Sequence, residues 1–222
     1  MNLQQTLFLF DCDGVLVDSE FIACEIVANE LNKIGFNITT QEYILRFCGR
    51  TDEEEKQIIE KEMGKPLPEN FRQAVRQKTY KEFSSRLLPI KGIEKILTSL
   101  SNKCVASGGS LEKINNSLRL TKLDSFFLNE EIFSASMVAR GKPNPDLFLH
   151  AAHCMGYLPS ECFVIEDSIS GIQAAKAANM KAIGFIGGSH CSPAHKAILL
   201  NEGADFVFDN MADLSEYIKT IA

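Results

Sequence analysis

The chain has 222 residues, 45% of them hydrophobic and 23% charged, which is an ordinary composition for a globular protein with a sizeable core. Its Lys and Arg residues number 23 against 29 Asp and Glu residues, so the formal net charge is −6. This balance argues against nucleic acid as a partner, because binding to phosphate backbones usually needs a basic face. No apolar run approaches the roughly 20 residues of a membrane helix, and Leu7–Phe10 is too short for a signal peptide. We therefore expect a cytoplasmic monomer without a membrane partner.

Seven cysteines are scattered along the chain without a Cys-x-x-Cys pair: Cys12, Cys24, Cys48, Cys104, Cys154, Cys162 and Cys191. Several of them lie in apolar runs, where a thiol behaves as a small hydrophobic side chain. Because their number is odd and their spacing irregular, we expect reduced structural thiols rather than disulfides or a zinc site.

Short apolar runs alternate with helical patterns, which predicts a parallel sheet flanked by helices. The predicted strands are Leu7–Phe10, Lys103–Ala106, Glu131–Phe133, Cys162–Ile165, Ala182–Phe185 and Phe206–Phe208. The predicted helices between them are Gly92–Leu100, Leu111–Leu118, Pro145–Met155, Gly171–Ala178 and Pro193–Glu202. We expect the first strand near the centre of the sheet, between the second and the fourth. Ligands of such open sheets bind outside the carboxyl ends of the strands, so the polar residues after each strand are the candidates for function.

Residues 19–87 break this alternation, because they contain no convincing strand. Helical periodicity at 26–34 and at 52–62, and a long polar stretch that runs through Lys81, predict helices instead. We interpret 19–87 as a small helical domain inserted after the first strand. The remaining residues, 1–18 and 88–222, would form the sheet domain.

The first predicted strand runs directly into the acidic motif Asp11-Cys12-Asp13-Gly14. Two carboxylates one residue apart can both face a site if the chain turns on leaving the strand, and Gly14 permits that turn. The motif alone is also similar to the start of a calcium-binding loop. That interpretation requires a glutamate at the twelfth position, which here is Ile22, so we disfavour it.

Three further motifs follow in chain order. They are Ser107 at the end of Val105-Ala106-Ser107-Gly108-Gly109, Lys142 in Gly141-Lys142-Pro143-Asn144-Pro145-Asp146, and Glu166-Asp167-Ser168 followed by Gly171. Each motif alone has an ordinary structural explanation as a turn, a solvated lysine or a helix cap. Together with the acidic motif, and over nearly the whole chain, they resemble the haloacid dehalogenase-like hydrolases, and more closely their phosphatase and phosphosugar mutase branch. The resemblance implies an α/β fold with a Rossmann-like parallel-sheet core and a small α-helical cap domain inserted after the first strand.

The residue types of these motifs suit phosphoryl transfer to and from a carboxylate. Asp11 can attack phosphorus to give an aspartyl phosphate. Asp13 can protonate the leaving oxygen and then deprotonate the attacking water. Ser107, Gly108 and Lys142 would bind the phosphoryl oxygens, with the lysine offsetting negative charge on both the nucleophile and the phosphate.

The same motifs supply hard oxygen ligands for Mg²⁺. Asp11 and Asp167, with the backbone carbonyl of Asp13, form a set of oxygen atoms suited to this ion. Glu166 could add charge directly or through a metal-bound water. Such a cation lets an anionic nucleophile approach an anionic phosphate. The four histidines show no metal-ligand spacing and are left out of the site: His150, His153, His190 and His195.

Within the helical insert, Cys48-Gly49-Arg50-Thr51 precedes the predicted helix that begins with Asp52. A glycine-led loop with a cationic side chain at a helix N-terminus suits an anion or a sugar. In the enzymes that the chain resembles, the similar cap loop contributes to specificity, so Arg50 and Thr51 are candidates for substrate contacts. The alternative is an exposed helix cap beside a solvated arginine.

The function that we expect is a Mg²⁺-dependent phosphatase of a small phosphorylated metabolite, such as a sugar phosphate. A phosphosugar mutase is the alternative. The mutases of the β-phosphoglucomutase type carry a cap histidine five residues beyond the aspartate that corresponds to Asp18, and this position here is Ala23. A dehalogenase is disfavoured because that branch lacks the second aspartate, here Asp13. A non-catalytic binding protein is disfavoured because every catalytic position is filled.

Overall fold

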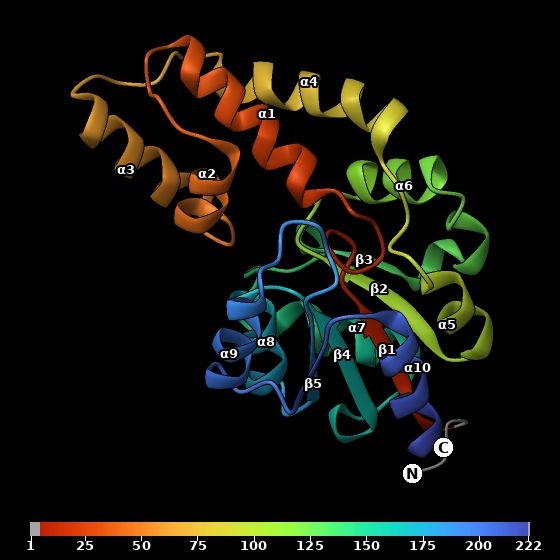
Figure 1. Ribbon diagram of the computed structural model, residues 1–222. Coiled ribbons are helices and arrows are strands. Elements are labelled where there is room, and N and C mark those ends of the chain that lie inside the picture. The colour runs from red at the N-terminus through yellow and green to blue at the C-terminus, as the bar shows by residue number, and fades with distance from the viewer. Residues whose placement is uncertain (1–4, 222) are drawn as a thin grey trace. The chain divides into compact units, whose positions relative to one another are not determined.

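The computed structural model describes residues 5–221, and the chain divides into two compact units (Figure 1). The larger unit comprises the described parts of 1–18 and 88–222, and the smaller unit comprises Ser19–Leu87. Residues 1–4 and 222, which the sequence assigns to the sheet domain, lie outside the described residues.

The larger unit is built on a six-stranded sheet with the strand order β3-β2-β1-β4-β5-β6, in which all neighbours are parallel. Its strands are β1 (Leu7–Phe10), β2 (Lys103–Ser107), β3 (Ile132–Ser134), β4 (Cys162–Glu166), β5 (Lys181–Phe185) and β6 (Phe206–Phe208). The predicted fold class, with β1 between β2 and β4, is confirmed. The chain winds outward from β1 on both sides, which creates a topological switch point at the carboxyl ends of these strands.

Helices cover the sheet in the larger unit (Figure 1). They are α5 (Ile93–Ser99), α6 (Leu111–Leu120), α7 (Asp146–Met155), α8 (Ile169–Ala177), α9 (Pro193–Asn201) and α10 (Met211–Thr220). Four short 3₁₀ helices lie between them: η2 (Asp124–Phe126), η3 (Asn129–Glu131), η4 (Ala135–Met137) and η5 (Pro159–Glu161). Five of the α-helices agree with the sequence-based expectation to within two residues at each end, whereas α10 was not predicted.

The core lies between the sheet and these helices. Leu7 and Leu9 of β1 belong to a buried cluster with Phe148 of α7 and Ile172 of α8. All four side chains of β1 are buried, as expected for a central strand that is covered on both faces. The position of Asp11 at the end of β1 is therefore held by a rigid and fully packed strand.

The smaller unit is helical throughout its ordered elements (Figure 1). Its helices are α1 (Glu20–Lys33), α2 (Thr40–Phe47), α3 (Asp52–Met63) and α4 (Phe71–Arg86), and α1 packs against both α2 and α4. Thr39 and Thr51 are the N-caps of α2 and α3, and each forms a capping box. The threonine side chain accepts a hydrogen bond from the backbone N–H of Glu42 or Glu54, and the glutamate side chain accepts one from the threonine N–H. The helix α2 was not predicted as a separate element, although its capping box is visible in the sequence.

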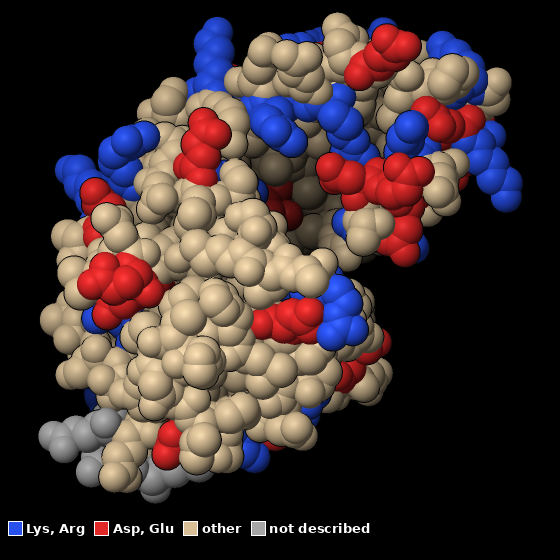
Figure 2. Space-filling model, turned by 180° about the vertical axis from the view of Figure 1, so that it is seen from behind, with Lys and Arg blue, Asp and Glu red and all other residues tan. Residues whose placement is uncertain are grey.

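Charged side chains of both signs lie side by side on the helical unit (Figure 2). The face of the larger unit in the same view is mostly uncharged. Positive and negative side chains largely balance, in agreement with the modest formal net charge of −6. Among residues 5–221, no helix has the length and the apolar character that crossing a membrane requires.

Candidate active site

The predicted catalytic carboxylates lie at the carboxyl ends of the central strands. The backbone N–H of Asp11 donates to the carbonyl of Ile165 at 3.0 Å, so the chain leaves β1 directly beside the end of β4. Glu166 ends β4, and Asp167 follows it. Asp11, Glu166 and Asp167 each offer a carboxylate oxygen within 4.8 Å of the others, and all three residues are buried. Three acidic groups that are distant in sequence therefore form one cluster.

Lys142 inserts its ammonium group into this cluster. Its Nζ donates to Asp11 Oδ1 at 2.6 Å, to the carbonyl of Ala106 at 3.0 Å and to Glu166 Oε1. The side chain is only 8% exposed, so these partners replace water around the charge. Lys142 thus links the ends of β1, β2 and β4, and its contacts join two of the three clustered carboxylates.

Glu166 is held by the start of α8 as well as by Lys142. Its Oε2 accepts hydrogen bonds from the backbone N–H of Ser168 at 3.1 Å and from the Ser168 hydroxyl at 2.8 Å. The same hydroxyl accepts from the N–H of Gly171 and caps the helix. A Cβ at Gly171 would lie 1.9 Å from the Glu166 carboxyl carbon, so only glycine leaves room for this carboxylate. Both Glu166 oxygens are thus already bound within the protein.

Gly14 makes room for Asp167 in the same way. It has φ +76°, and a Cβ there would lie 1.8 Å from Asp167 Oδ2. The backbone after β1 and the carboxylate after β4 therefore approach each other more closely than any side chain would allow. This contact gives Gly14 a function beyond the turn that the sequence predicts.

Two of the histidines that the sequence analysis leaves out of the site contact Asp167. His190 Nε2 lies 3.1 Å from Asp167 Oδ2, and His195 Nε2 donates to the backbone carbonyl of Asp167 at 2.8 Å. Burial alone would lower the pKa of His190, but its hydrogen bonds to Asp167 and Cys191 outweigh burial and raise the pKa to about 12. Both histidines follow β5 in a region without a motif, so spacing offered no signal for them.

The side chain of Asp13 has a hydrogen-bond partner that the sequence analysis also missed. Its Oδ2 accepts a hydrogen bond from Lys113 Nζ at 2.7 Å. Lys113 lies in the first turn of α6, whose cap is Ser110. The Asp13 side chain is not part of the three-carboxylate cluster, so a contribution of Asp13 to a metal site would come from its backbone carbonyl.

Ser107 and Gly108 lie at the carboxyl end of β2, beside the residue whose carbonyl binds Lys142. Ser107 is only 2% exposed, and its hydroxyl accepts from the N–H of Gly109 at 3.2 Å. Gly108 is exposed, and a Cβ there would meet nothing within 4 Å. The turn after β2 therefore places the buried hydroxyl of Ser107 next to the solvent-exposed backbone of Gly108.

The electrostatics of the cluster call for a cation. Burial raises the pKa of the Asp11 carboxyl well above its usual range, Lys142 opposes this, and Glu166 and Asp167 raise it further. Burial alone would lower the pKa of Lys142, but Asp11 and Glu166 raise it instead. Lys142 and the protonated His190, which is paired with Asp167, together offset two of the three buried carboxylates and leave negative charge in excess. The all-oxygen ligand set and its excess negative charge fit Mg²⁺.

The candidate residues of the smaller unit occupy the loop before α3. Arg50 is exposed, and its Nε donates to the carbonyl of Arg46 at 2.8 Å. Thr51 is the N-cap of α3: its Oγ1 accepts from the N–H of Glu54 at 3.3 Å and donates to Glu54 Oε2 at 2.9 Å. Thr51 thus has a structural function in capping, while Arg50 is exposed and hydrogen-bonds back to the end of α2.

Comparison with protein families agrees with this geometry. A family model described as haloacid dehalogenase-like hydrolase matches residues 8–185, a range that contains all four motifs. The chain belongs to the haloacid dehalogenase-like hydrolases. The resemblance that the motifs indicate is thereby confirmed, and with it the expectation of an enzyme.

Similar members of the haloacid dehalogenase-like hydrolases differ in what their names say they do. The chain is 31% identical over 186 residues to the 6-phosphogluconate phosphatase of Escherichia coli (strain K12), covering 83% of this chain and 84% of the relative. It is 30% identical over 188 residues to the β-phosphoglucomutase of Bacillus subtilis (strain 168), with 79% and 81% covered. A solved haloacid dehalogenase-like protein of unknown function from Agrobacterium tumefaciens str. C58 superimposes with a TM-score of 0.90 at 35% identity, covering 97% of this chain and 98% of that one.

Proposed function

We propose that this haloacid dehalogenase-like phosphatase hydrolyses a small phosphorylated metabolite, in particular a sugar phosphate, with Asp11 as nucleophile and Mg²⁺ as cofactor. The observation that carries the proposal is the buried group of Asp11, Glu166 and Asp167, whose oxygen atoms lie within 4.8 Å of one another around a single lysine. Such a group is costly to bury for structural reasons alone, and it is suited to binding a metal ion and a phosphate.

The reaction proceeds in two steps at phosphorus. In the first step a carboxylate oxygen of Asp11 forms a bond to phosphorus, while the bond to the leaving oxygen breaks and Asp13 donates its proton to that oxygen. In the second step Asp13 takes a proton from water, and the water oxygen displaces Asp11 from phosphorus. Free phosphate and the regenerated aspartate result. Ser107 and the backbone of Gly108 bind the phosphoryl oxygens and hold phosphorus in line with Asp11. Lys142, whose three N–H groups already donate to Asp11, Ala106 and Glu166, offsets the charge of the phosphate.

Asp11, Asp167 and the backbone carbonyl of Asp13 would hold the metal ion. Mg²⁺ at these ligands supplies positive charge that lets the anionic nucleophile and the anionic phosphate approach each other. Glu166 contributes mainly by orienting Lys142, because both of its oxygens already accept hydrogen bonds from Ser168 and Lys142. Gly14 keeps the path between β1 and Asp167 free of a side chain.

A sugar phosphate is the proposed substrate class for two reasons. One relative at 31% identity is a 6-phosphogluconate phosphatase and another at 30% is a β-phosphoglucomutase, and both names refer to phosphorylated carbohydrates. Arg50 is an exposed cation on the loop before α3 and would contribute to the choice of substrate, with Thr51 supporting the loop as a helix cap. The cytoplasmic location, the monomeric state and the lack of nucleic-acid or membrane partners stay predictions from the sequence.

The phosphosugar mutase is the second candidate function, because the similarity to the Bacillus subtilis mutase is nearly as high as that to the phosphatase. Ala23, where the mutase pattern requires histidine, favours hydrolysis. A mutase must also protect its aspartyl phosphate from water until the intermediate has reoriented, whereas a phosphatase gains nothing from such a delay.

Purified protein with Mg²⁺ and a panel of phosphorylated metabolites tests the proposal, and phosphorus NMR of a hexose 1-phosphate separates the two candidates. We expect inorganic phosphate to appear in step with substrate loss, without a requirement for a bisphosphate activator. Accumulation of the hexose 6-phosphate with little inorganic phosphate would establish the mutase instead. No turnover of any panel member would contradict both.

A further inference from the structure

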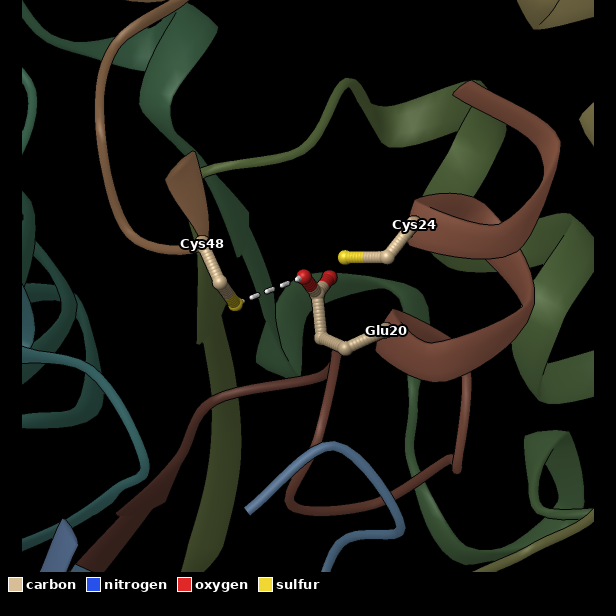
Figure 3. Close-up of side chains that lie close together, drawn as sticks. All are labelled: Glu20, Cys24 and Cys48. Atoms are coloured by element: carbon tan, nitrogen blue, oxygen red, sulfur yellow. Dashed lines mark hydrogen bonds between the residues drawn. The ribbon is translucent and has the colours of Figure 1, made fainter. Parts of the chain in front are cut away.

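Three metal-ligand side chains meet in the smaller unit. Glu20 and Cys24 lie four residues apart on α1, so they share one face of the helix, and Cys48 follows the end of α2. In Figure 3 the carboxylate of Glu20 and the thiol of Cys24 extend from α1 toward Cys48. The Cys48 Sγ donates to Glu20 Oε2 at 3.9 Å.

The distances in this cluster are close to those of a metal site. One ligand atom from each of Glu20, Cys24 and Cys48 lies within 4.8 Å of the other two. Around tetrahedral zinc, with Zn–S near 2.3 Å and Zn–O near 2.1 Å, ligand atoms are about 3.5–3.8 Å apart. Contracting the cluster by about 1 Å through side-chain rotation would reach this geometry. Cys24 is buried while Glu20 and Cys48 are half-buried, so an ion could enter from solvent.

The charges around the cluster favour a cation. Glu55 is only 5% exposed and lies near enough for its charge to act on Cys24. Its Oε2 accepts from Arg72 at 3.1 Å, whereas among the described residues its Oε1 has no hydrogen-bond partner. Glu20 and Glu55 therefore bring two carboxylates to this part of the unit, with Arg72 paired to one of them.

A nucleophilic function of the thiols is disfavoured. The hydrogen bond with Cys48, then burial, and then the charges of Cys48, Glu20 and Glu55 raise the pKa of the Cys24 thiol. Reactive cysteines need the opposite environment, one that stabilises the thiolate. A cation that binds sulfur tightly displaces the thiol protons and forms bonds that do not require a reactive thiolate in the free protein.

We propose that Glu20, Cys24 and Cys48 form a binding site for a thiophilic divalent cation of the zinc class. Two thiolates and one carboxylate are the protein ligands, and the fourth tetrahedral position is left to water or to a ligand. The site is independent of the oxygen cluster around Asp11, because its sulfur ligands select against Mg²⁺. It departs from the expectation, drawn from cysteine spacing alone, that the chain has no zinc site.

Titration of the full-length reduced protein with Co²⁺ in excess Mg²⁺ tests this proposal. Mg²⁺ occupies oxygen ligands, and near-ultraviolet charge-transfer absorption reports Co²⁺ bound to thiolate. We expect this absorption to saturate at one Co²⁺ per chain and to disappear when one equivalent of Zn²⁺ is added. Bound zinc measured by mass spectrometry after gel filtration should agree with this stoichiometry.

Variants assign the ligands. Cys48→Ser, Cys24→Ala and Glu20→Gln should each weaken Zn²⁺ binding by at least about tenfold, because even partners outside the ligand set typically cost that much. Cys154→Ser is the matched control, since Cys154 is exposed and lies on α7 of the larger unit. It should bind like the unaltered protein. Thermal melting identifies a variant that fails to fold, and if Cys24→Ala does so, Cys48→Ser and Glu20→Gln decide.

Two outcomes would overturn the proposal. One is no thiolate absorption at millimolar Co²⁺, and the other is absorption whose intensity and Co²⁺ dependence are unchanged in folded Cys48→Ser. If mild oxidation instead links Cys24 to Cys48 and the reduced protein binds no zinc, the pair is redox-active and the metal site is wrong.

Discussion

Lys113 Nζ donates to Asp13 Oδ2 at 2.7 Å, so the first turn of α6 holds the side chain that would transfer protons in the active site. The lysine side chain is 29% exposed and the aspartate side chain 14%. Because a proton-transfer group must be oriented toward the leaving oxygen, this ion pair gives Lys113 a positioning function.

Lys113→Met should therefore lower kcat by about tenfold to a hundredfold with a smaller change in KM, because it leaves the substrate ligands in place but removes the hydrogen bond from Lys113 to Asp13. Lys113→Arg should restore part of the loss, since it keeps a cationic donor. Lys95→Met, at an exposed position on α5, is the control and should match the unaltered enzyme. Steady-state kinetics on the best substrate of the panel provide the measurement. If Met and Arg at position 113 give equal rates, the ion pair has no function in proton transfer.

Asp11→Asn should reduce turnover by at least about 10³-fold, because the nearly isosteric amide is a far poorer nucleophile. The fold should persist, since the change removes one of several mutually repelling buried carboxylates while leaving an oxygen to accept from Lys142. Phosphate release with Mg²⁺ measures the first effect and circular dichroism the second. A well-folded variant with near-native rates would rule out the aspartyl phosphate.

Mg²⁺ should stabilise the protein against heat. An ion that binds only the folded state at a hundredfold excess over its Kd contributes about 2.7 kcal/mol, which for a chain of this size raises Tm by about 5–10 °C. Asp167→Asn should lose most of this increase because it removes a proposed ligand. Asp124→Asn, an exposed position in η2, should keep it. Melting curves with EDTA and with increasing Mg²⁺ test this, and an equal increase in both variants would remove Asp167 from the metal site.

Arg50→Ala should change the ranking of substrates and raise KM by more than it lowers the rate with saturating substrate. The reason is that Arg50 is an exposed cation outside the buried cluster, so its loss leaves the reacting groups unchanged. Arg76→Ala, at an exposed position of α4, is the control for loss of a positive charge from the same unit. Specificity constants across the substrate panel are compared. An unchanged ranking would leave Arg50 with its hydrogen bond to Arg46 as its only function.

Asp205 provides a prediction about stability and pH. Burial would raise the pKa of this carboxyl, but the backbone N–H of Ala182 and the ammonium groups of Lys176 and Lys181 outweigh burial and lower it. A carboxyl with a lowered folded-state pKa stabilises the protein above its unfolded pKa, and this stability is lost as the pH falls through the folded pKa.

Asp205→Asn should therefore cost about 1–2 kcal/mol of unfolding free energy at pH 7, and the difference should narrow as the pH falls below about 4. Denaturant unfolding at several pH values measures it, with Asp124→Asn as the exposed control. If the difference in unfolding free energy between Asp205→Asn and the unaltered protein stayed constant with pH, the shape of the side chain rather than its charge would be responsible for the loss of stability.

Local patterns in the sequence determined the elements and the chemistry of the motifs. The apolar run of β1 needs burial on both faces, so Leu7–Phe10 had to be a central strand. The residues that follow it had to lie at the edge of the sheet where ligands bind. The helices α10 and α2 were not predicted, and the short apolar pattern of α2 is hard to separate from that of its neighbours. Asp11, Ser107, Lys142 and Asp167 could be predicted as candidates because each belongs to a recognisable motif at a strand end or in a loop.

Only the tertiary structure decided which groups share a contact, because these contacts join segments that have no fixed spacing in the sequence. The pairs of Lys113 with Asp13 and of His190 with Asp167 connect positions far apart in the chain. Gly14 looked like a residue that permits a turn, whereas the space beside its α-carbon is filled by Asp167, which follows β4. Cys24 and Cys48 show no metal-binding spacing in the sequence because Cys24 lies on α1 and Cys48 follows the end of α2, so the two meet only when α1 packs against α2. Secondary-structure propensity depends on neighbouring residues, whereas a functional site depends on which surfaces the packing of the core brings together.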